Sequence, residues 1–416
     1  MSRITLAAWA CCALWAGHAA AADNYTASYP LASGPQVVTG SSSLSGMLQS
    51  IGLATITPSV PVPFDLSLRG VPANLSGAAV NLGNAAVFAG QLRIPSTGAN
   101  AQFTAPTWTA VLDQVQRFLL QGPEAVALQR ESVRSSPFDP VAGNPSSLMA
   151  RVVAYDFNSA FLPFASNVAD GPVQVAQAGG LPIGAVRGPL PTLPGLGAQA
   201  GIFRDDGRAA KSLTIPLSLT LRSDLDPRRQ FSFSLPLTVT DVDGAGSVQG
   251  TLGAAVRLPV NREWALSGNL GYSIVSSEDL GSAGKIGSLS VTSSYVVRTE
   301  SGDLGLGNMI GYYRTLSGTI SGIDTVSGIS NTVFRNGLLW SMPAPGWIGL
   351  GRSIEYSFVN TTYTGSELYL RSYNELGLTI GTNKRADSTR SYMQGGLSVL
   401  FSAKTTGLMA SYGYWF

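Results

Sequence analysis

The stretch Lys404–Phe416 reads KTTGLMASYGYWF, and its large apolar and aromatic side chains recur at every second position. Side chains of an extended strand alternate between its two faces, so this stretch predicts a β-strand. One face carries Leu408, Ala410, Tyr412, Tyr414 and Phe416, and the other carries Gly407, Met409, Ser411, Gly413 and Trp415. An aromatic strand with an open edge would promote aggregation in water. The stretch therefore argues against an ordinary soluble sheet.

This ending resembles the C-terminal strand of bacterial outer-membrane β-barrels, which has aromatic residues at the last and at alternate preceding positions. The resemblance implies that Tyr412, Tyr414 and Phe416 form an outer-membrane insertion signal, read by the barrel-assembly machinery. It also implies that outer-membrane lipid surrounds the protein. We therefore expect an all-β fold: an antiparallel transmembrane β-barrel that follows a mixed N-terminal region with two or three helices.

Residues 1–22 have the pattern of a secretory signal peptide. Arg3 is the positive start, Ile4–Gly17 is the apolar core, and Ala20 and Ala22 form the cleavage site. An apolar core of about 14 residues is too short to span a bilayer as a membrane anchor. The sequence thus predicts export.

Cleavage after Ala22 would remove Cys11, Cys12 and His18, which are all the cysteines and histidines of the chain. A lipoprotein site at these cysteines is disfavoured by the bulky Trp9. The mature chain would then lack a disulfide, a thiolate metal site and a Ser–His pair. A carboxylate or lysine mechanism stays open, but no motif supports one. We expect no enzyme, no catalytic or metal-binding residues and no cofactor.

Charged residues make up only 12% of the chain, against about 25% in ordinary soluble domains. The net charge of +2, which removal of Arg3 lowers further, argues against a nucleic-acid partner. The mean hydropathy is +0.18, yet the mature chain has no apolar run long enough for a membrane helix. Alternating barrel strands produce this combination.

Residues 23–165 are expected to form an exported N-terminal region of short strands followed by helices near 107–121, 124–133 and 145–161. Two arrangements of these helices stay open. They could pack as a small bundle, or one of them could lie inside the barrel lumen. Residues 166–203 are rich in proline and glycine and read as a linker that is long enough to thread a lumen.

Apolar–polar alternation continues through residues 204–416, the expected barrel. Eleven strands can be counted, and bacterial barrels have even numbers. A twelfth strand is expected between 190 and 209 or among the N-terminal runs, and ten strands is the alternative. The eleven are 211–221, 231–239, 247–260, 263–275, 286–299, 303–316, 331–340, 347–360, 367–381, 389–402 and 404–416.

The last strand of bacterial barrels descends to the periplasm, which implies an orientation for every connection. The periplasmic turns would be 223–230, 261–262, 300–302, 341–346 and 382–388. The extracellular loops would be 241–246, 276–285, 317–330, 361–366 and 403. The two longest connections fall outside, as expected for a barrel.

The alternation also predicts which side chains face the lumen. Small and polar residues dominate the early strands, and the charged candidates are Arg257, Arg335, Glu355, Arg371 and Glu375. Arg371 and Glu375 could pair across the lumen and hold the barrel together. Alternatively, charged residues could form a selectivity ring.

Signal peptide, exported region, linker and C-terminal barrel together resemble the autotransporter family. The resemblance implies a twelve-stranded translocator barrel that anchors its own N-terminal region, with a helix or linker in the pore and with secretion machinery as a partner. The N-terminal region is short and lacks β-helix repeats, so a solitary, monomeric autotransporter-like barrel fits best. The location would be the outer membrane of a Gram-negative bacterium, with the N-terminal region at the surface, in the lumen or in the periplasm. The alternatives are a channel or uptake protein with an N-terminal plug, and a surface adhesin or structural protein.

Overall fold

The computed structural model describes residues 23–30, 36–52, 60–82, 85–161, 192–205, 207–223, 228–345, 353–381 and 392–415. The expected signal peptide with Ala20 and Ala22, most of the expected linker, and Phe416 lie outside the described residues.

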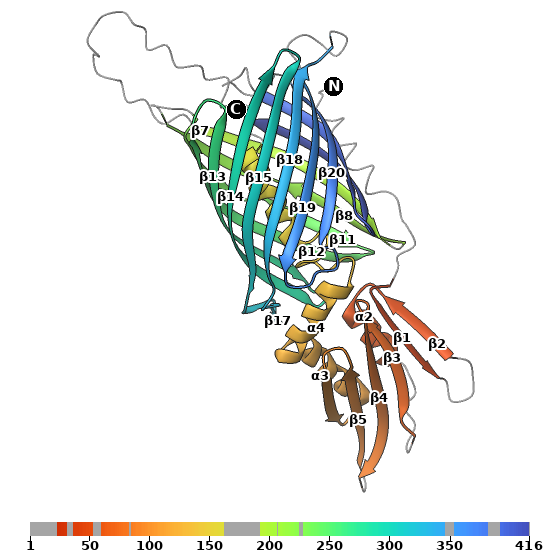
Figure 1. Cartoon of the computed structure of the whole chain (residues 1–416). Helices are drawn as coiled ribbons and strands as arrows, with labels where there is room; N and C mark the ends of the chain where they lie inside the picture. The colour runs from red at the N-terminus through yellow and green to blue at the C-terminus, as the bar shows by residue number, and fades with distance from the viewer. Residues whose placement is uncertain are drawn as a thin grey trace, which may run out of the picture.

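The C-terminal part is a closed antiparallel β-barrel (Figure 1). Its two ends meet because β22 pairs with β7, with Leu408 opposite Ile202 and Trp415 opposite Gly195. The strands are β7 (Thr192–Asp205), β8 (Arg208–Ile215), β9 (Leu217–Arg222), β10 (Gln230–Ser234), β11 (Leu237–Val242), β12 (Ala245–Pro259), β13 (Trp264–Ser277), β14 (Ser282–Thr299), β15 (Gly302–Leu316), β18 (Ser330–Pro343), β19 (Ser353–Gly365), β20 (Ser372–Gly381), β21 (Tyr392–Phe401) and β22 (Thr406–Trp415).

These fourteen segments make twelve barrel strands. The segments β8 and β9 form one strand that is interrupted at Pro216, and β10 and β11 form one that is interrupted near Pro236. Proline has no N–H group for the ladder and therefore breaks it locally. Pairing continues across each break: β7 pairs with both β8 and β9, and β12 pairs with both β10 and β11. The expected total of twelve strands is confirmed.

The twelfth strand is β7, which lies between 190 and 209 as expected. It also occupies the end of the stretch 166–203, so the reading of 192–203 as linker is wrong. Its sequence, TLPGLGAQAGIFRD, has little intrinsic strand preference. Hydrogen bonding to β22 on one side and to β8 and β9 on the other therefore stabilises the extended conformation that the local sequence does not favour.

Two further strand boundaries differ from expectation by five residues. The strand expected at 347–360 is seen as β19, which continues to Gly365 through the expected loop 361–366 because it pairs along its length with β18. The strand expected at 367–381 begins only at Ser372.

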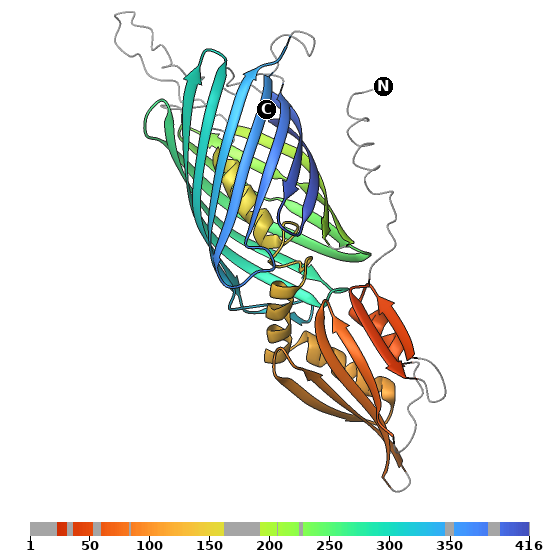
Figure 2. The same ribbon diagram turned by 45° about the vertical axis from the view of Figure 1, so that its right-hand side comes forward.

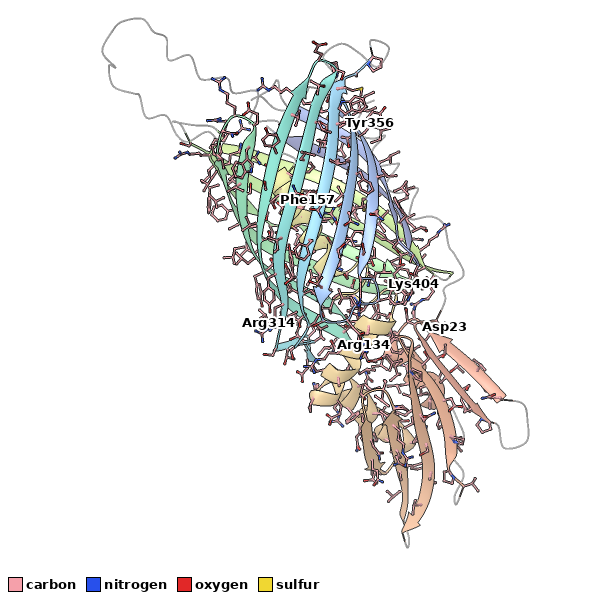
Figure 3. The ribbon with its side chains drawn as sticks, in the orientation of Figure 1. Asp23, Arg134, Phe157, Arg314, Tyr356 and Lys404 are labelled. Carbon is pink, nitrogen blue, oxygen red and sulfur yellow. The ribbon has the colours of Figure 1, made fainter. Side chains whose placement is uncertain are left out.

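The outside of the barrel is apolar. Leu252, Leu270 and Leu289 are each about 60% exposed, and every one of them points away from the lumen. Aromatic side chains flank this band: Tyr272 and Tyr312 toward one end, and Trp340 and Tyr356 toward the other (Figure 3). Such an apolar band between aromatic girdles is the exterior of a membrane-embedded barrel. Among the described residues, no helix combines the length and apolarity needed to cross a bilayer.

The N-terminal domain, defined here as residues 23–135, is an antiparallel sheet with helices on one face. The sheet order is β2-β1-β3-β4-β5-β6. Its elements are β1 (Tyr25–Pro30), β2 (Gln36–Ser41), α2 (Leu44–Gly52), β3 (Val62–Leu68), β4 (Val71–Leu82), β5 (Ala85–Ile94), β6 (Ala99–Ala105), α3 (Trp108–Leu120) and α4 (Pro123–Ser135). Helices α3 and α4 match the predicted ones closely, whereas α2 was not expected. Phe64 and Trp108 stack in the core between sheet and helices, with their ring centroids 5.8 Å apart.

Helix α5 (Leu148–Phe161) lies inside the barrel, as the yellow helix in Figure 2 shows. It contacts β12, β13, β14 and β15 rather than α3 or α4. The reading of the three helices as one small bundle is therefore wrong, and the reading with a helix in the lumen is right. The N-terminal domain sits outside one mouth of the barrel (Figures 1 and 2).

Candidate functional site in the barrel lumen

The chain enters the lumen through residues 136–147, here called the entry segment, which are buried almost throughout. Backbone hydrogen bonds hold this segment to the loop between β19 and β20: Leu370 N–H donates to the carbonyl of Gly143 at 2.9 Å. Gly143 has φ +96°, and a Cβ there would lie 2.4 Å from the carbonyl oxygen of Val133. Glycine is needed at this bend because any other residue would clash.

The apolar face of α5 packs into the barrel wall at two glycines. Gly307 of β15 and Gly337 of β18 lie directly opposite each other in the ladder. A Cβ at Gly307 would lie 2.5 Å from the Phe161 ring, and one at Gly337 would lie 2.7 Å from the Phe157 ring. The absence of side chains thus makes room for both rings, which are buried. Figure 3 shows Phe157 midway along the barrel. Helix and wall are complementary in shape.

The polar side chains of α5 are hydrogen-bonded to strands β8, β13, β14 and β15 of the wall. The Asp156 carboxylate accepts a hydrogen bond from the Tyr313 hydroxyl at 2.9 Å and a longer one from Ser290 at 3.5 Å. One turn further, the Ser159 hydroxyl donates to the Asn269 side chain at 3.3 Å. At the start of the helix, Arg151 donates to the Thr214 hydroxyl at 3.0 Å. Polar groups removed from water need such partners, so α5 has one favoured position and rotation.

Of the predicted lumen residues, Arg335 and Glu375 pair with each other, Nη1 to Oε1 at 2.7 Å. The Arg335 guanidinium also lies over the Phe157 ring, 5.3 Å from its centroid, and is 1% exposed. The prediction that Arg371 and Glu375 pair across the lumen is wrong. Arg371 lies in the loop before β20, is exposed, and pairs with Glu367 at 3.2 Å. The misassignment arose because the strand begins after Arg371, at Ser372.

The other two predicted lumen residues are buried. Arg257, near the end of β12, donates from Nη1 to the Ala160 carbonyl at 2.6 Å, in the last turn of α5. A cation at a helix C-terminus interacts favourably with the exposed carbonyls there. Glu355 accepts a hydrogen bond from the Ser341 hydroxyl at 3.3 Å. The charged residues therefore hold the helix and the wall in place rather than forming a ring around an open pore.

Beside α5, one part of the wall consists of small hydroxyl side chains. Those that are buried and have no hydrogen-bond partner among the described residues include Ser247, Ser267, Ser273, Ser288 and Thr292, on β12, β13 and β14. Between α5 and β19–β20, a cavity of about 10 Å³ borders Met149, Tyr363 and Tyr373. Such a volume holds about one water molecule.

The N-terminal domain closes the mouth of the barrel through contacts with several of its loops. The Tyr25 hydroxyl donates to the Leu280 carbonyl at 2.7 Å, between β13 and β14, and burial raises the pKa of Tyr25 to about 12. Leu44 N–H donates to the Asp279 carbonyl at 3.0 Å, and the Gln129 side chain donates to the Asp324 carbonyl at 2.8 Å. Asp324 belongs to the small hairpin of β16 (Thr319–Ile320) and β17 (Ile323–Asp324).

A buried ion pair connects the N-terminal domain to the entry segment. Arg69 Nη1 lies 3.2 Å from Asp139 Oδ2, and both side chains are almost fully buried. Burial raises the pKa of the Asp139 carboxyl above its usual range, and the neighbouring Arg69 guanidinium opposes that shift. Removing either partner would leave an uncompensated buried charge. The pair thus holds the N-terminal domain to the entry segment.

Of the predicted insertion signal, the structure places Tyr412 on β22 with its side chain partly exposed on the outer face. The side chain of Tyr414 and all of Phe416 fall outside what is described. Sequence reasoning missed Asp156, Tyr313 and the two glycines opposite Phe157 and Phe161. A usable signal existed: Gly307 and Gly337 fall on the inward side of their strands, and Phe157 and Phe161 are one helical turn apart.

No protein-family model and no curated protein matches the chain. Among solved structures, it is similar to the translocator domain of the autotransporter NalP from Neisseria meningitidis, at 13% identity and a TM-score of 0.42, over 54% of this chain and 88% of that one. The β-domain of the Bordetella autotransporter BrkA matches at 11% identity and a TM-score of 0.42, over 54% and 98%. An outer-membrane channel from Pseudomonas putida F1 matches at 15% identity and a TM-score of 0.40, over 57% and 97%. These likenesses concern the barrel fold and say nothing about function.

Proposed function

We propose that this protein is an outer-membrane barrel that anchors its own N-terminal domain at the cell surface, in the manner of an autotransporter. The observation that carries the proposal is the path of the chain. The N-terminal domain lies at one mouth, α5 runs through the lumen, and β7 starts at the opposite end, where Gly195 pairs with Trp415. The described chain therefore enters the barrel at one mouth, and its next described segment, β7, begins at the other end.

The orientation follows from the last strand. If β22 ends on the periplasmic side, as the resemblance to bacterial barrels implies, the N-terminal domain is outside the cell. The loops expected to be extracellular from the sequence at 241–246, 276–285 and 317–330 include the residues that contact this domain: Val242, Asp279, Leu280 and Asp324. The N-terminal domain therefore contacts the loops at the end that strand counting assigns to the outside of the cell.

A cysteine-labelling experiment tests this orientation, because the expected mature chain contains no cysteine of its own. Gln102→Cys lies on the solvent-exposed face of β6, and Glu300→Cys lies in the exposed turn between β14 and β15 at the opposite end. In intact cells, a membrane-impermeant maleimide should label Gln102→Cys and leave Glu300→Cys unlabelled. Both should react after the outer membrane is permeabilised.

The unsubstituted chain is the control for background labelling. Protection of Gln102→Cys combined with labelling of Glu300→Cys in intact cells would place the N-terminal domain in the periplasm and refute surface anchoring.

A channel with an N-terminal plug is the second candidate, and the hydroxyl-rich wall of β12–β14 favours it. If α5 left the lumen, these small polar side chains would line a space that water could fill. Conductance distinguishes the two candidates, because a channel must open in the intact chain.

A further inference from the structure

Two basic side chains project from the outside of the barrel, near the mouth that carries the N-terminal domain. Lys285 is on β14 and Arg314 is on β15, and both point outward, because Leu289 and Tyr312 on the same faces are exposed. Lys285 pairs with Leu316, and Arg314 pairs with Gly287. The two basic residues are therefore diagonal neighbours on adjacent strands, within reach of one another. Figure 3 shows Arg314 on the outer wall toward this mouth.

Neither cation has a partner within the described residues, where no ion pair or side-chain hydrogen bond includes Lys285 or Arg314. Two other basic residues at this end have acidic partners: Arg208 pairs with Asp243, and Arg134 pairs with Glu131 and Glu367. Like charges at neighbouring ladder positions repel each other, which destabilises the sheet. An anion between them would remove that cost.

The surroundings of the two cations place them at headgroup depth. Tyr272 of β13 pairs with Gly287, and Tyr312 precedes Arg314 by two positions on the same face. Both tyrosines are about half exposed and belong to the aromatic girdle at this end. The next position toward the mouth is therefore at the polar boundary of the membrane. Gly287 has no side chain, and between Tyr272 and Arg314 the nearest side-chain atom is Leu316 Cδ1, 3.7 Å from where a Cβ would lie.

We propose that Lys285 and Arg314 bind a phosphate group of a phosphorylated glycolipid of the outer leaflet. A guanidinium presents paired donors to phosphate oxygens, and an ammonium adds a compact second charge. The Tyr272 hydroxyl, and the Ser330 hydroxyl opposite Arg314, border the same surface and are available to the sugar. The choice of the outer leaflet rests on the proposed orientation, whereas the phosphate chemistry does not.

Native mass spectrometry of the full chain in detergent tests the site. The probes are bis-phosphorylated lipid A, its dephosphorylated form and phosphatidylglycerol. The expected result is that lipid A binds, and that Lys285→Gln/Arg314→Gln weakens this binding about tenfold or more, since each basic residue near an anionic headgroup contributes to affinity. Arg262→Gln, which removes one exposed cation at the opposite end, should leave binding unchanged.

Equal retention of lipid A by the double variant and the unsubstituted chain would overturn the site, and so would equal binding of the dephosphorylated form. Tighter binding of phosphatidylglycerol than of lipid A at this site would overturn the choice of a glycolipid. Because the measurement is made in detergent, its result is independent of the cysteine-labelling result. The lipid-binding site can therefore be confirmed or refuted whether or not the N-terminal domain proves to be surface-exposed. Heat-dependent gel mobility confirms that each variant is folded.

Discussion

At the scale of single residues, α5 and the barrel wall are complementary in shape and in charge. Gly307 and Gly337 leave the space that Phe157 and Phe161 fill, and the Arg335 guanidinium covers the Phe157 ring while Glu375 balances its charge. Buried charges are costly unless they are paired. The polar and apolar contacts on opposite faces of α5 together determine how the helix is oriented.

A substitution at Gly307 tests this fit. Gly307→Val should lower the free energy of unfolding by about 1–3 kcal/mol, because the new side chain overlaps the Phe161 ring. Urea unfolding of the protein in detergent, followed by tryptophan fluorescence, measures the change.

The matched control is Gly268→Ala on the outer face of β13, where a Cβ meets only an ordinary contact at 3.7 Å. Adding Phe161→Ala to Gly307→Val should restore part of the lost stability. Additive losses in the double variant would show that the two residues do not share this space.

At the scale of elements, β7 is the strand on which barrel closure depends. It pairs with β22, β8 and β9, so it joins the first and last parts of the sheet. A barrel avoids exposed strand edges only when every strand is present. The boundary between removable chain and essential barrel therefore lies before Thr192, not at 204.

Two deletions separate these boundaries. Removal of residues 23–161 keeps β7 and should leave a barrel that resists SDS until heated, visible as a heat-dependent shift in gel mobility. Removal of residues 23–205 takes β7 away and should abolish that shift, because β22 then has no partner strand on one side. The same mobility shift in both deletions would mean that β7 is dispensable.

At the scale of the whole molecule, the N-terminal domain, the entry segment and α5 form one continuous closure of the barrel. The domain covers the mouth through hydrogen bonds to loops between β13 and β14 and between β15 and β18, while α5 fills the lumen. Two parts of the chain therefore close the barrel: the N-terminal domain at the mouth and α5 in the lumen.

Single-channel recording in planar bilayers measures this closure. The intact chain should stay closed, and the chain without residues 23–161 should show open steps, since the hydroxyl-rich wall then borders water. Frequent openings of the intact chain would show that α5 leaves the lumen, and would favour the channel over the anchor. Absence of open steps after the deletion would contradict the assignment of α5 as the element that fills the lumen.

Much of the architecture could be predicted because period-two alternation is a local property. Each barrel strand from 211 onward shows which of its faces is apolar, and helices α3, α4 and α5 show helical periodicity and capping. The alternation likewise identified Arg257, Arg335, Glu355 and Glu375 as lumen-facing. Arg371 was misplaced because the strand start was misjudged by five residues, and a strand boundary depends on which residues find a pairing partner.

The sequence alone determined that this chain has an alternating, membrane-type β-domain and a separate helical and β-rich N-terminal region, since both patterns repeat over neighbouring residues. Only the tertiary structure decided that α5 occupies the lumen, that Arg335 takes Glu375 as its partner, and that glycine-rich β7 closes the barrel. These outcomes depend on contacts between residues far apart in the chain. Such contacts are selected by shape, pairing and burial in the folded barrel, and no local pattern encodes them.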